Sequence, residues 1–137
     1  METVVTFEIF LGLILASVLG AIVGIEREIT FKPAGLRTHM LVSLGSCLFT
    51  VISVGFDFDP ARIASGIVAG IGFIGAGAIW AEKDKIRGIT TASSLWVTAA
   101  IGLAVGVGDY PLALIVTGLV FLILSSKIIF KKLGFEK

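Results

Sequence analysis

Polar residues that could bind a carboxylate or a phosphate flank several long apolar stretches of this sequence. One group ends the first stretch, begins the second or begins the fourth: Glu26, Arg27, Arg37, Arg87, Thr90 and Thr91. Guanidinium groups form bidentate contacts with carboxylates and phosphates, so these side chains could make one functional cluster. The alternative is that the arginines only set membrane topology and the threonines only cap helices. The sequence favours neither interpretation of the three arginines.

A second group, Asp57, Asp59 and Arg62, lies between the second and third apolar stretches. Two nearby carboxylates could bind Mg²⁺, which prefers oxygen ligands, but two alone bind it weakly. We therefore favour a structural role, in which Asp59 caps the next helix and Arg62 pairs with Asp59 or Asp57. His39 is the single histidine, and no cysteine stands at ligand spacing from it, which argues against a transition-metal site.

The segment GIGFIG, residues 70–75, matches the glycine pattern of dinucleotide-binding loops. Such a loop follows a strand and opens a helix, whereas this segment lies inside a helix-length apolar stretch. A phosphate could not be solvated there, so we reject the match. With no metal-ligand cluster and no nucleophile–base pair in view, an enzyme is the least favoured class of protein.

Glycines four residues apart offer a better interpretation, because they let membrane helices approach closely. The glycines expected to pack helices are Gly20, Gly24, Gly66, Gly70, Gly72, Gly75, Gly77, Gly102 and Gly106. The third stretch carries five of these glycines, so we expect it to form the central helix of a bundle. The alternative is a helix broken near residues 70–77, whose free carbonyls would coordinate an ion.

The composition places these groups in a membrane. Of the 137 residues, 56% are hydrophobic and only 15% are charged, and the mean hydropathy is +1.05. A net charge of +1 gives no field that would attract nucleic acid. Spans of about 20 apolar residues cross a bilayer. The sequence therefore predicts an all-α domain over residues 1–137, with five transmembrane helices at about 9–25, 39–56, 62–80, 89–108 and 112–130.

Basic residues predict the orientation of this bundle. Of the 11 lysines and arginines, all except Arg62 lie in the first connector, the third connector or the tail. Basic connectors face the cytoplasm, so we expect the N-terminus outside and the C-terminus inside. No span centre carries an ionisable residue, which argues against a proton relay.

Three motifs in order, KPAGLRTH (32–39), DPARIASGIVAGIGFIGAGAIW (59–80) and RGITTASSLW (87–96), resemble the membrane domain of the MgtC/SapB family. The resemblance runs from about residue 11 to residue 107. It implies a multi-pass protein of the bacterial inner membrane, linked to magnesium limitation, virulence or stress survival. The matching positions are Glu26, Arg27, Pro33, Gly35, Arg37, Asp59, Arg62, Gly70, Gly72, Gly75, Gly77, Arg87, Gly88, Thr90, Thr91 and Trp96.

The resemblance also implies a mode of action. Some family members are thought to inhibit the F-type ATP synthase, so we expect a non-enzymatic regulator that binds another membrane complex of this kind. Glycine-rich faces also make a homodimer an expected partner state. We expect no cofactor beyond Mg²⁺ as a ligand, and no soluble C-terminal domain after the last span. The alternative is a small oligomeric ion transporter or channel, with Mg²⁺ among the ions to test.

Overall fold

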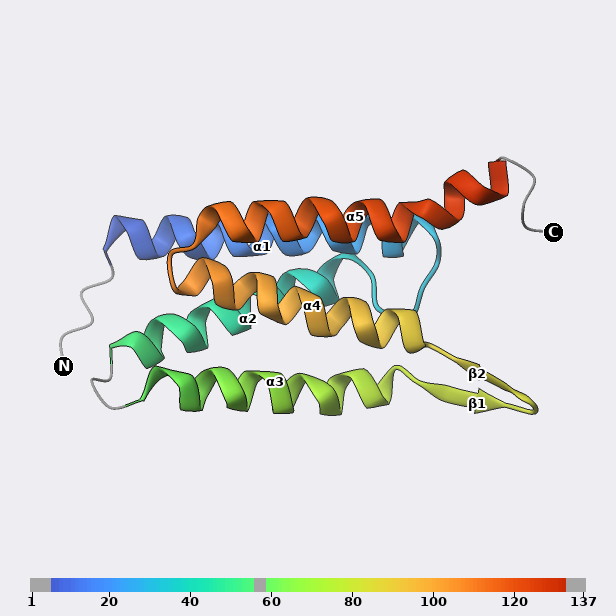
Figure 1. Ribbon diagram of the computed structural model, residues 1–137, viewed down its shortest axis with the longest axis horizontal. Helices are drawn as coiled ribbons and strands as arrows, with labels where there is room; N and C mark the ends of the chain where they lie inside the picture. The colour runs from blue at the N-terminus through green and yellow to red at the C-terminus, as the bar shows by residue number, and fades with distance from the viewer. Residues whose placement is uncertain (1–5, 56–58, 133–137) are drawn as a thin grey trace.

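A computed structural model describes residues 6–55 and 59–132 (Figure 1). It contains five helices and one β-hairpin within these ranges. The elements are α1 (Phe7–Ile29), α2 (Leu36–Val54), α3 (Pro60–Gly77), β1 (Trp80–Glu82), β2 (Lys85–Arg87), α4 (Ile89–Gly106) and α5 (Tyr110–Lys132). Four helices are long and apolar enough to cross a membrane, and α3 is a shorter apolar helix.

The hairpin β1–β2 is a feature that the predicted all-α fold lacked. The helix α3 ends at Gly77, before the predicted span end at residue 80, and Trp80 instead pairs with Arg87 across two antiparallel strands. A two-residue turn joins the strands, and Lys83 adopts a φ of 52° there. The alternative of a helix broken near residues 70–77 is also wrong, because α3 is continuous through this segment.

The central helix of the bundle is α4, which contacts each of the other four helices. Its packing with α1, α2 and α5 forms an apolar core that includes Leu19, Val23, Cys47 and Ile101. The prediction that the glycine-rich stretch is central is therefore wrong for the single chain. The helix α3 lies at the edge of the bundle (Figure 1), and most of its residues are exposed.

Two sets of glycines behave differently in this arrangement. At four positions an added Cβ would lie within 3.0 Å of an atom of α2: Gly20, Gly24, Gly102 and Gly106. At Gly20, for example, it would lie 2.5 Å from the carbonyl oxygen of His39. The missing side chains thus let α1 and α4 approach α2 at backbone distance.

The glycines of α3 make few such contacts. An added Cβ would meet nothing within 4 Å at Gly66, Gly70, Gly72 and Gly77. At Gly75 it would make an ordinary contact of 3.5 Å with Ala92 of α4. These glycines therefore leave open space beside α3 instead of packing it against the other helices.

The alternating directions of the helices gather the basic connectors at one end. The α1–α2 connector, the hairpin and the C-terminal part of α5 lie together (Figure 1), and we call this the basic end. The α2–α3 and α4–α5 connections lie at the opposite end. That the basic end faces the cytoplasm stays a prediction.

Candidate functional site

A buried ion pair marks the last turns of α1 at the basic end. Glu26 and Arg27 are only 4% and 3% exposed, and the Nε of Arg27 lies 2.5 Å from Oε2 of Glu26. Consecutive helical residues start about 100° apart around the axis, so only long side chains can meet in this way. The hydroxyl of Thr30 donates to the carbonyl of Glu26 at 2.8 Å and closes the helix beyond the pair.

His39 links α2 to α4 beside this pair. The side chain is fully buried, with Nδ1 2.9 Å from the carbonyl oxygen of Gly35 and Nε2 3.0 Å from Oγ of Ser94. A carbonyl oxygen can only accept, so Nδ1 must carry a hydrogen. The position of His39 at a close helix crossing explains its burial, because Gly24 of α1 lies against its Cβ.

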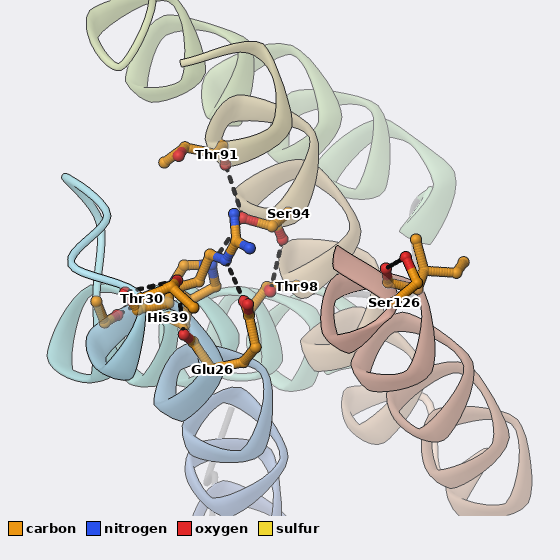
Figure 2. Close-up of polar contacts among 10 residues, drawn as sticks. Glu26, Thr30, His39, Thr91, Ser94, Thr98 and Ser126 are labelled. Carbon is orange, nitrogen blue, oxygen red and sulfur yellow. Dashed lines mark hydrogen bonds and ion pairs between the residues drawn. The ribbon is translucent and has the colours of Figure 1, made fainter. Parts of the chain in front are cut away.

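The hydroxyls of α4 complete the cluster. Ser94 Oγ lies 2.8 Å from the carbonyl oxygen of Thr91, and Thr98 Oγ1 donates to the carbonyl of Ser94 at 2.7 Å. Residues three and four apart share one helix face, so these side chains lie on one face of α4, from which Ser94 contacts His39 of α2. Figure 2 shows Glu26, His39, Ser94 and Thr98 converging from the three helices. We call Glu26, Arg27, His39, Thr91, Ser94 and Thr98 the buried polar cluster.

The single hydroxyl hydrogen of Ser94 has two possible acceptors. When His39 is neutral, the hydroxyl donates to Nε2. When His39 is charged, Nε2–H donates to Ser94, and the hydroxyl turns to the carbonyl of Thr91. The same heavy-atom arrangement therefore gives the Ser94 hydroxyl an acceptor in either protonation state of His39.

Two buried oxygens near the cluster have no hydrogen-bond partner in the described part of the chain. They are Oε1 of Glu26 and Oγ of Ser43. A buried acceptor without a partner costs about 1–3 kcal/mol. The free oxygen of Glu26 is thus the point of the cluster that can still accept a hydrogen bond from a water molecule or from another group.

The structure divides the first predicted group of site residues. Glu26, Arg27 and Thr91 belong to the buried polar cluster, whereas Arg37, Arg87 and Thr90 are exposed. Arg87 pairs with Glu82 across the hairpin at 2.7 Å, and Arg37 lines a polar surface pocket of about 370 Å³ beside the α1–α2 connector. Neither Thr90 nor Thr91 caps α4, because the N-cap position is occupied by Gly88, whose φ is 90°.

The second predicted group lies at the opposite end. Asp59 occupies the N-cap position of α3, but its side chain makes no capping hydrogen bond, so the expected cap is wrong. Arg62 is exposed and forms no ion pair with any other residue in 6–55 or 59–132. Asp57 lies outside the described residues. Within them, no three His, Cys, Asp or Glu side chains gather as metal ligands, and Mg²⁺ binding at Asp57 and Asp59 stays a prediction.

Sequence reasoning did not find the linking role of His39 or the role of Glu28. The Oε2 of Glu28 accepts the N–H of Leu36 at 2.9 Å and caps α2. The spacing of Thr91, Ser94 and Thr98 along one helix face was the available signal for the α4 part of the cluster. The contact between Glu28 and Leu36 spans a turn, and no local spacing rule predicts it.

Four helices that are long and apolar enough to cross a bilayer indicate a multi-pass membrane protein. The sequence profile of the MgtC family matches residues 13–133, and the chain belongs to this family. Among curated relatives it is 42% identical to "Putative magnesium transporter YhiD" of Escherichia coli K12, covering 96% of this chain and 64% of the relative. It is 44% identical to "Protein MgtC" of Salmonella typhimurium, covering 85% and 51% respectively.

The chain therefore spans less than two thirds of the length of these relatives. An uncharacterised protein of Haemophilus influenzae is 39% identical over 73% of this chain and 47% of its own length. No solved structure matches the chain.

Proposed function

We propose that this chain is a regulatory domain of the bacterial inner membrane that acts in adaptation to low magnesium, without catalysis, by binding another membrane complex. The names of its relatives support the link to magnesium. The F-type ATP synthase is the first complex to test as a partner. In the proposed orientation the buried polar cluster lies on the cytoplasmic side and the N-terminus lies outside.

The observation that carries this proposal is the packed interior between α1, α2 and α4. Below the buried polar cluster, the core consists of apolar side chains that include Ala16, Leu19, Val23 and Ile101. The hydroxyls of Ser46, Thr50 and Thr98 donate to backbone carbonyls, so their hydrogens are satisfied within the bundle. The close packing of these helices through Gly20 and Gly102 leaves little room between them for a hydrated ion, which supports action through the surfaces of the bundle.

The second candidate is an oligomeric transporter or channel for Mg²⁺, which the printed name of the E. coli relative favours. A path in that case would run between subunits. An assay of Mg²⁺ entry distinguishes the regulator from the transporter. The purified chain is reconstituted in proteoliposomes that contain a magnesium-sensitive dye. The regulator predicts Mg²⁺ entry equal to that of empty liposomes, and entry several times above this background would overturn it in favour of transport.

A complementation assay tests the regulatory role directly. The chain is expressed in a bacterial strain without its own MgtC-family protein, and growth is measured at limiting and at ample Mg²⁺. The regulator predicts rescue at limiting Mg²⁺ together with cross-links to another membrane complex in native membranes. Rescue without any such cross-link, or no rescue by a well-expressed chain, counts against it.

A further inference from the structure

A long apolar groove runs between α2 and α3 on the surface of the bundle. Its volume is about 890 Å³, and its walls include Leu41 and Phe49 of α2 and Ile67 and Ile74 of α3. Leu41 and Phe49 are 67% and 59% exposed, so these large side chains border the groove without filling it. The groove is open to whatever surrounds the helices.

Glycines on both walls create this space. Gly45 of α2 and Gly66 and Gly70 of α3 line the groove, and an added Cβ would meet nothing within 4 Å at any of them. Elsewhere in the bundle, glycines bring two backbones together. Here they face an unfilled volume, so helix packing within the chain does not account for them.

An exposed arginine stands at one end of the groove. Arg62 lines it at the opposite end of the bundle, is exposed, and has no ion-pair partner among the residues that the structure describes. A guanidinium at the end of a membrane helix lies at headgroup depth and binds phosphate through two parallel hydrogen bonds.

The shape of the groove suits an extended occupant. From Arg62 to Ile74 the groove follows 12 residues of α3, or about 18 Å, and its walls are apolar for most of this length. Extended hydrocarbon chains can lie along such a groove. A helix of a second copy is the alternative occupant, and the variants described below distinguish the two.

We propose that the groove binds an anionic phospholipid, with its acyl chains along Gly66 and Gly70 and its phosphate paired with Arg62. The apolar walls supply van der Waals contacts along the acyl chains, because a chain that moves from the bilayer into the groove gains packing and not hydrophobic burial. Arg62 supplies headgroup preference, because a headgroup without its own cation leaves the phosphate free to pair. In the proposed orientation the lipid belongs to the outer leaflet. This inference does not depend on the proposed regulatory function.

Native mass spectrometry tests the site. The full chain is released from nanodiscs that contain equal amounts of phosphatidylglycerol and phosphatidylcholine, and the retained lipids are identified. Retention of phosphatidylglycerol over phosphatidylcholine by roughly fivefold is expected, in line with about 1 kcal/mol of headgroup preference. Arg62→Gln should bring this ratio close to one, whereas Lys85→Gln on the hairpin should leave it unchanged.

A matched pair of variants tests the acyl-chain part. Gly70→Leu fills the groove and should lower total lipid retention at least fivefold, whereas Gly72→Leu, on the same helix but outside the groove, should retain as much lipid as the parent. Equal retention by the two variants would overturn the proposal. A dimer of the parent chain that Gly70→Leu abolishes would also overturn the proposal, because the groove would then bind a second copy of the chain. Arg62→Gln remains decisive if Gly70→Leu does not fold.

Discussion

Removing Arg27 should destabilise the bundle more than the loss of any exposed charge. In Arg27→Met, the carboxylate of Glu26 keeps its place at 4% exposure but loses its ion-pair partner. Its other oxygen already has no hydrogen-bond partner among the described residues. Breaking a buried pair by deleting one member costs about 3–5 kcal/mol, because a buried charge is left uncompensated. This corresponds to a roughly 10²- to 10⁴-fold rise in the unfolding equilibrium constant.

The double variant Glu26→Gln/Arg27→Met removes both charges and should recover more than half of that loss. The assay is equilibrium unfolding of the purified chain in mixed micelles with rising fractions of sodium dodecyl sulfate, followed by circular dichroism. Arg37→Met is the matched control: Arg37 is exposed, and its loss should change the free energy of unfolding by less than about 0.5 kcal/mol. A cost below about 1 kcal/mol for Arg27→Met, or a double variant as unstable as the single one, would refute the buried pair.

Three further predictions concern local contacts. Asp109→Ala should lower the free energy of unfolding by about 1 kcal/mol, because it removes the side-chain cap on α5. Asp59→Ala should change it very little, because the Asp59 side chain does not cap α3. Equal losses for the two variants in micelle unfolding would contradict this assignment of the caps. Gly88→Ala should lower the melting temperature more than Gly108→Ala. Both glycines have a positive φ, but only at Gly88 would an added Cβ collide with the backbone of the α3–β1 connection. The reverse order of melting temperatures would show that this contact is absent. His39→Ala should cost about 1–3 kcal/mol by removing the two hydrogen bonds of the buried imidazole, to Gly35 and to Ser94, and a loss below 0.5 kcal/mol in the same unfolding assay would exclude the link.

Hydropathy predicted the existence and order of all five helices but not all of their ends. The helix α1 continues to Ile29, past the predicted end at residue 25, because Glu26 and Arg27 neutralise each other inside it. A hydropathy scale scores each residue separately, so it assigns Glu26 and Arg27 to the connector that follows the helix. The hairpin was missed because three-residue strands carry too little pattern, and only the pairing of Trp80 with Arg87 reveals them.

The sequence predicted at which end of the bundle the candidate site lies, but not which residues form it. Topology places Glu26, Arg37 and Arg87 at one end of the bundle, but it does not say which of them the helices enclose. Burial depends on where glycines allow backbones to meet, as Gly24 does beside His39. Glycines at the same spacing in α3 do not pack against a neighbouring helix, and Gly70 borders a groove instead. Spacing alone does not show which face of a helix contacts another helix.

The buried ion pair joins two consecutive residues, and this has a consequence for biosynthesis. A pair between distant helices could form only after both had been made, so each charge would enter the bilayer alone. Glu26 and Arg27 leave the ribosome together and can neutralise each other within the nascent α1. The end of α1 therefore carries no net charge at this pair before the later segments that will enclose it have been translated.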